Sequence, residues 1–73
     1  MHSRVLVLAA IHYLKNRRPD GSVLVGDLQD TLYRSGVIWK RGTVQGYLRA
    51  MVDEAILERL DLNVYRLILI DET

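Results

Sequence analysis

Cysteine is absent from this chain of 73 residues. Its absence excludes disulfides, thiolate metal sites and cysteine nucleophiles, and it agrees with a reducing compartment, so we expect a cytoplasmic protein. Proline occurs only at Pro19, while 49% of the residues are hydrophobic and 26% are charged. This composition indicates neither disorder nor a long linker, and we expect a single folded domain over residues 1–73.

Long apolar runs are also missing. A membrane-spanning helix needs about 20 consecutive apolar residues, and the run from Val5 to Ile11 is far shorter. This run follows Arg4 and so imitates a signal peptide. However, polar or bulky residues come next, at His12, Tyr13 and Lys15, where a small-residue cleavage site would be needed. We therefore expect neither a membrane helix nor secretion.

The residue groupings that support catalysis are lacking as well. The sequence shows no serine, histidine and acid grouping, no phosphate-binding glycine loop and no paired carboxylates in an evident pocket. His2 and His12 have no companions at metal-ligand spacing. We expect no enzyme, no metal, no cofactor and no small-molecule substrate. A net charge of only +1 further excludes binding of nucleic acid by bulk electrostatics, so any DNA contact must use a local basic patch.

Three segments have helical periodicity. Ser3 can cap a first helix that runs to about Asn16 and is stopped by Pro19-Asp20-Gly21. A second helix opens at Gly26 or Asp27, places Leu28, Leu32 and Tyr33 at helical spacing, and stops at Ser35-Gly36. A third begins near Gly42 or Thr43 and ends around Glu54-Ala55. The connection between the second and third helices contains Trp39, which we interpret as a core or edge-of-core anchor.

Strand-like segments lie between the first two helices and after the third. Ser22–Val25 is predicted to pair, as a third strand, with a hairpin formed by Ile56–Leu60 and Val64–Ile70. Asp61-Leu62-Asn63 is the predicted turn, because Asp and Asn tolerate the positive backbone angles of tight hairpins. Alternation places Tyr65, Leu67 and Leu69 on one face of the last strand. We expect a helix to cover one face and the first helix or a partner chain to cover the other.

The third helix divides into an apolar and an outward face. The apolar side chains recur at three- and four-residue intervals: Val44, Leu48, Met51, Val52 and Ala55. The outward residues are small, polar or basic: Thr43, Gln45, Gly46, Arg49 and Ala50. Glycine inside a helix costs about 1 kcal/mol relative to alanine, so Gly46 indicates close approach by DNA or by a neighbouring helix, and we favour packing.

This order of elements resembles the winged helix-turn-helix superfamily of small bacterial, archaeal and phage regulators. The stretch from Val25 to Leu32 looks like that family's second helix, and the stretch from Gly42 to Met51 looks like its recognition helix. The resemblance implies an α+β winged helix with three helices, a small antiparallel β-sheet and a wing hairpin. The chain departs from the pattern in its longer connection before the recognition helix and in a wing tip, Asp61-Leu62-Asn63, without a basic residue.

The resemblance also implies duplex DNA as the partner. It places Thr43 near a phosphate, with Gln45, Gly46 and Arg49 facing the groove. The residues that we expect at the interface are Arg34, Lys40, Arg41, Thr43, Gln45, Gly46, Tyr47 and Arg49. Plainer alternatives are an Arg49 paired with Asp53, a merely exposed Gln45, and solvated Lys40 and Arg41. We expect a half-buried Tyr47 ring whose hydroxyl reaches a phosphate.

Apolar residues almost all the way round the first helix indicate a second contact surface. We expect a homodimer through the first helix and the last strand, at Val5, Leu8, Leu67 and Leu69. Such a dimer would set two recognition helices about 34 Å apart, one DNA turn, and regulate transcription by occupying a site. The alternative is a winged-helix module that docks on another protein without binding DNA.

Overall fold

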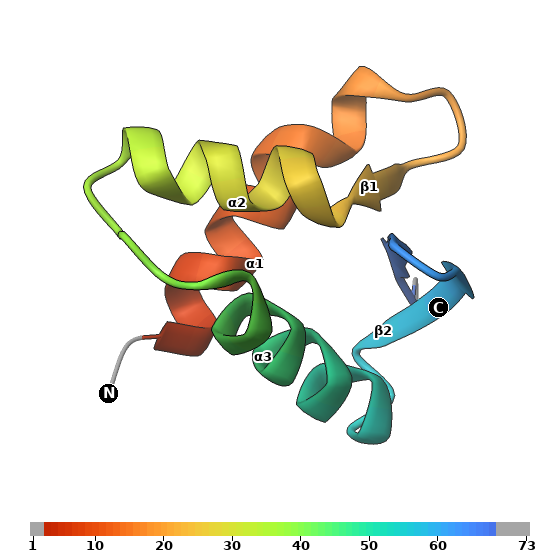
Figure 1. Cartoon of the computed structure of the whole chain (residues 1–73). Helices are drawn as coiled ribbons and strands as arrows, with labels where there is room; N and C mark the ends of the chain where they lie inside the picture. The colour runs from red at the N-terminus through yellow and green to blue at the C-terminus, as the bar shows by residue number, and fades with distance from the viewer. Residues whose placement is uncertain (1–2, 69–73) are drawn as a thin grey trace.

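A computed structural model describes residues 3–68. The elements are α1 (Ser3–Leu14), a short 3-10 helix η1 (Lys15–Arg17), β1 (Ser22–Leu24), α2 (Val25–Arg34), α3 (Arg41–Asp53), β2 (Leu57–Asp61) and β3 (Val64–Leu67). Three helices and a small antiparallel sheet confirm the predicted α+β class, and the element order is the predicted one. Figure 1 shows α1 and α2 packed against each other, with α3 below them and the hairpin following from the end of α3.

One core joins the helices to the sheet. Each helix contributes one apolar stripe, and the sheet contributes the side chains on one of its faces. The buried apolar residues are Val7, Ala10, Ile11, Leu14, Val23, Val25, Leu28, Leu32, Val44, Leu48, Met51, Leu57 and Tyr65. The predicted apolar face of α3 is therefore confirmed at Val44, Leu48 and Met51. Tyr33 is 61% exposed, because its position on α2 points away from the stripe of Leu28 and Leu32.

The last two helices end in the same way. After α2, Gly36 has a φ of 90°, its N–H bonds to the Tyr33 carbonyl, and the Val37 N–H bonds to the Leu32 carbonyl. This is a Schellman motif with glycine in the left-handed position, as the sequence predicts. After α3 the equivalent position is Ala55, with a φ of 62°.

Ala55 therefore lies outside α3 and is exposed, so its predicted place on the apolar face of the helix is wrong. The Ala55 N–H bonds to the Val52 carbonyl and the Ile56 N–H to the Met51 carbonyl, which completes the same motif without glycine. A β-carbon in the left-handed region costs about 1–2 kcal/mol, so this helix end is strained.

The sheet has the order β1-β3-β2, and both pairings are antiparallel. β1 is thus the third strand that the sequence predicts. The hairpin differs from the prediction in its backbone. Among residues 3–68, Ala55 alone has a positive φ without being glycine, so neither Asp61 nor Asn63 has one. Instead, the register shifts by one residue between Arg59 and Asp61, and this bulge supplies the local twist that a primed turn would otherwise provide.

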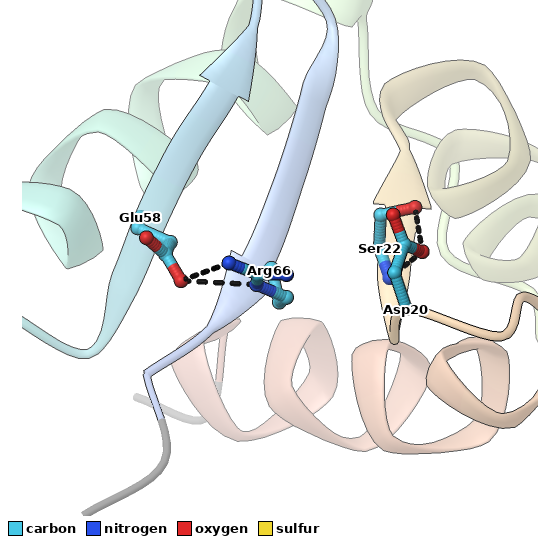
Figure 2. A network of polar contacts seen from close by, with 4 residues as sticks. All are labelled: Asp20, Ser22, Glu58 and Arg66. Carbon is cyan, nitrogen blue, oxygen red and sulfur yellow. Dashed lines mark hydrogen bonds and ion pairs between the residues drawn. The ribbon is translucent and has the colours of Figure 1, made fainter.

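Polar residues occupy the outer face of the sheet (Figure 2). Arg66 on β3 donates to the Glu58 carboxylate on β2 through two nitrogens, at 3.0 and 2.9 Å. Beside them the Ser22 hydroxyl and backbone N–H donate to Asp20, at 2.7 and 3.0 Å, and the Arg18 Nε donates to the Ser22 hydroxyl at 2.8 Å. These side chains cover the described part of the face where we expected α1 or a partner chain. Leu69 and Ile70 lie outside the described residues.

The hydrogen bond from the Ser22 hydroxyl, followed by the one from its backbone N–H, lowers the pKa of the Asp20 carboxyl below the usual 3.8. Both donors favour the ionised carboxylate. The turn that leads from α1 into the sheet is therefore more stable with Asp20 charged.

Candidate nucleic-acid interface

The outer face of α3 is open to solvent. Thr43, Gly46, Arg49 and Ala50 are exposed, and Gln45 is half-buried. Within the part of the chain that the structure describes, Arg49 forms no ion pair, so the alternative in which Asp53 neutralises it is not observed. The face predicted for DNA therefore carries an available guanidinium and an amide.

Gly46 packs against no other element among residues 3–68. A β-carbon built on it would meet no atom within 4 Å, and the same is true of Gly42 one turn earlier. The packing explanation favoured from the sequence is therefore wrong, because no neighbouring helix approaches this position. Close approach by DNA, the other explanation, stays a prediction.

The segment before α3 is anchored by side chains, although it is longer than a tight turn. The Trp39 and Tyr47 rings lie against each other with their centroids 5.0 Å apart, and both residues are half-buried against the core. Gln29 on α2 donates to the Trp39 carbonyl at 3.0 Å and accepts from the Arg41 Nε at 2.7 Å. The predictions of an anchoring Trp39 and a half-buried Tyr47 ring are confirmed, and Gln29 fixes the start of α3 relative to α2.

The first turn of α3 favours an anion. Arg41 begins the helix, no acidic residue lies in its first turn, and Lys40 precedes it without capping it through its side chain. The first amide groups of such a turn lack helical partners and carry the positive end of the helix dipole. The third, the Thr43 N–H, bonds to the Lys40 carbonyl at 3.0 Å. Thr43 is exposed in the same turn. The bond to Gln29 directs the Arg41 side chain toward α2, while Lys40 is exposed at the helix start.

A groove of about 500 Å³ separates α3 from the hairpin. It joins Gln45 and Arg49 of α3 to Arg59 of β2 and Asn63 of the turn. Arg59 was not among the expected interface residues. The signal for it is weak: Arg59 lies two residues after the buried Leu57, on the same face of β2, and becomes recognisable only through its pairing with Tyr65.

Arg34 lies in a different place from the other basic residues. It forms an exposed ion pair with Asp30, at 3.2 Å, and lines a hollow between α1 and α2. Neither Arg49 nor Arg59 lines that hollow. The structure therefore brings together Gln45, Arg49 and a missed Arg59, and assigns Arg34 to another surface.

The expected dimer residues are also divided. Val5 is 60% exposed, whereas Leu8 and Leu67 are half-buried and pack against the core of their own chain. Leu69 lies outside the described residues. Of the three that the structure describes, only Val5 presents most of its side chain to a partner.

Other kinds of site find no support among residues 3–68. No group of three or more histidine, aspartate or glutamate side chains is placed to hold a metal ion there. Every buried side-chain nitrogen or oxygen in that range has a hydrogen-bond partner. None of the described helices combines the length and apolarity that a bilayer crossing requires.

Comparisons with protein-family models, with curated proteins and with solved structures find no match to this chain.

Proposed function

We propose that this chain is a winged-helix protein that binds duplex DNA, with α3 in the major groove. One observation carries the proposal: Gln45 and Arg49 of α3 line the same open groove as Arg59 of the hairpin. One arginine on the helix and one on the strand, on either side of an open groove, can each contact a phosphate of the DNA backbone. The diameter of α3 suits the major groove, which is about 12 Å wide.

The side chains divide into two roles. Arg49 and Arg59 have the geometry to contact phosphates, and Arg49 can instead donate to a guanine edge. Gln45 can pair with adenine. At the start of α3, Lys40, the Thr43 hydroxyl and the free backbone amides suit a phosphate, and the Tyr47 hydroxyl suits another.

The hairpin tip has little affinity for DNA in this proposal. Asp61 carries a negative charge at the tip, and the Leu62 side chain is 69% exposed. Neither favours insertion into a minor groove lined by phosphates. Arg59, in the middle of β2, replaces the basic wing tip as the hairpin's phosphate contact.

In this proposal the protein is a small homodimeric regulator. It occupies its DNA site and blocks access to that site. The binding is sequence-specific or general for duplex DNA. A protein-docking module is the second candidate, and it is favoured by the exposed apolar side chains of Val5, Ile38 and Leu62. The two candidates differ in how their affinity responds to salt, because phosphate contacts release counterions and apolar contacts do not.

A salt titration of binding to generic duplex DNA tests the proposal. We expect affinity to fall steeply with salt, and each of Arg49→Ala and Arg59→Ala to reduce the log–log slope by about 0.9, one phosphate contact. Lys15→Ala is the matched control, since it removes one positive charge on the far side of the sheet, where Lys15 lies beside Glu58 and Arg66. An equal loss in Lys15→Ala, or no binding at low salt, would refute the proposal.

A further inference from the structure

The outward face of α1 is mostly apolar, with His12 exposed at its edge. Val5 and Tyr13 are 60% and 59% exposed, and Leu6 and Ala9 are exposed between them. The opposite face of the helix already supplies the core. The Tyr13 ring is held in place, because Arg17 lies over it at 4.9 Å from the centroid and donates to its hydroxyl at 2.7 Å.

α2 runs beside this face and carries its acidic residues before its basic one. Asp27 and Asp30 come first and Arg34 last, and all three line the same hollow between α1 and α2 as Leu6 and Tyr13. The chain turns back through β1 between the two helices, so the acidic start of α2 lies toward the end of α1 (Figure 1). Arg34, in the last turn of α2, lines the same hollow as Leu6, near the start of α1.

We propose that this face binds a second copy of the chain about a two-fold axis that passes beside Ala9. Val5 lies four residues before Ala9, and Tyr13 lies four residues after it. When two α1 helices cross antiparallel at Ala9, Val5 of each meets Tyr13 of the other, and the small Ala9 side chains allow close approach. A two-fold interface must be self-complementary in this way.

The charges on α2 satisfy the same symmetry. Antiparallel α1 helices bring the Asp27 and Asp30 end of one α2 toward the Arg34 end of the other. The Asp30–Arg34 pair within one chain is exposed, with side-chain exposures of 57% and 77%. Exposed pairs of this kind are weak, so Arg34 can change partner on association.

This inference deepens the homodimer part of the proposed function and replaces the expected contacts at Leu8 and Leu67. Its test is the mass of the protein without DNA, so it fails or succeeds separately from DNA binding. Sedimentation should give wild type a mass of twice 8.4 kDa, falling to 8.4 kDa on dilution. A single-chain mass at the highest soluble concentration would overturn the inference.

Ala9→Glu tests the centre of the face. We expect its dissociation constant to rise roughly 100-fold or more, because it buries charge at the middle of an apolar contact. Ala50→Glu is the matched control, since Ala50 is an exposed alanine on α3, and it should leave the dimer unchanged. Both sites are on the surface, so circular dichroism should show folded variants. If both variants weakened dimerisation equally, or if Ala9→Glu did not weaken it, this face would not be the dimer interface.

A charge exchange tests the antiparallel arrangement. In a dimer of two Asp30→Lys chains, the new lysine of each chain faces Arg34 of the other. In a dimer of two Arg34→Glu chains, the new glutamate of each chain faces Asp27 and Asp30 of the other. Each variant alone should therefore dimerise more weakly than wild type. In the mixed dimer the introduced lysine faces the introduced glutamate, and the unchanged Arg34 faces the unchanged Asp27 and Asp30. Only Asp27 of the Asp30→Lys copy still faces a like charge, so the mixture should recover most of the mass of the wild-type dimer. Failure of the mixture to exceed the separate variants would contradict the arrangement.

Discussion

Gly46→Ala separates what stabilises the fold from what serves the interface. Gly46 lies in the interior of α3, where alanine is favoured over glycine by about 0.8–1.0 kcal/mol. The added methyl group meets no atom within 4 Å, so no clash offsets this gain. For a domain of this size, 1 kcal/mol raises the melting temperature by about 4–8 °C. We therefore expect a more stable protein.

The same methyl group should weaken DNA binding. If α3 lies in the major groove with Gly46 against the DNA, an extra carbon at the contact costs about 1–3 kcal/mol, as overpacking does in a well-packed interior. That corresponds to a loss of affinity of roughly 5- to 150-fold. The expected pattern is thus opposite in sign for the two measurements.

Thermal unfolding followed by circular dichroism and fluorescence anisotropy with labelled duplex DNA measure the two effects. Ala50→Gly, at an exposed position on the same helix, is the control and should lower the melting temperature by a similar amount. If affinity followed stability alone, Gly46→Ala would bind more tightly than wild type. Unchanged or tighter binding by Gly46→Ala would refute close approach at this position.

Three further substitutions test the fold itself. Ala55→Gly should stabilise the protein by up to about 1 kcal/mol in urea unfolding, because it relieves the left-handed strain at the end of α3. Leu48→Ala should destabilise it by about 2–5 kcal/mol in the same assay, since Leu48 is fully enclosed by the core. Asp20→Asn should remove a pH dependence of the stability. Because the pKa of Asp20 is lowered in the folded protein, its contribution to the stability is present above pH 3.8 and is lost as the pH falls through the lowered value. The urea midpoints of wild type and Asp20→Asn should therefore converge in acid.

Local patterns predicted the parts of the fold that depend on neighbours in sequence. The three- and four-residue spacing of Val44, Leu48 and Met51 identified the buried face of α3, and therefore also its open face. Ser35-Gly36 predicted a helix end because glycine at a left-handed position is a local signal. Ala55 adopts the same left-handed conformation, but alanine gives no local signal for it, so the sequence does not predict the exact end of α3.

Contacts between distant segments were beyond local patterns. Arg59 joins the candidate interface only because β2 pairs with β3 in a register that a bulge sets near the turn. Gln29 contacts Trp39 and Arg41 across the space between two helices, and its position in α2 gives no sign of this role. Such residues depend on how elements pack, which a single sequence does not specify.

We propose above that the open face of α3 and the middle of β2 meet DNA. Amide chemical shifts of the labelled protein, recorded during titration with duplex DNA, test it most directly. We expect the largest changes in residues 40–50 and around Arg59, with little change along α1. Changes concentrated on the α1–α2 face, or no changes at a protein concentration that gives dimers, would contradict it.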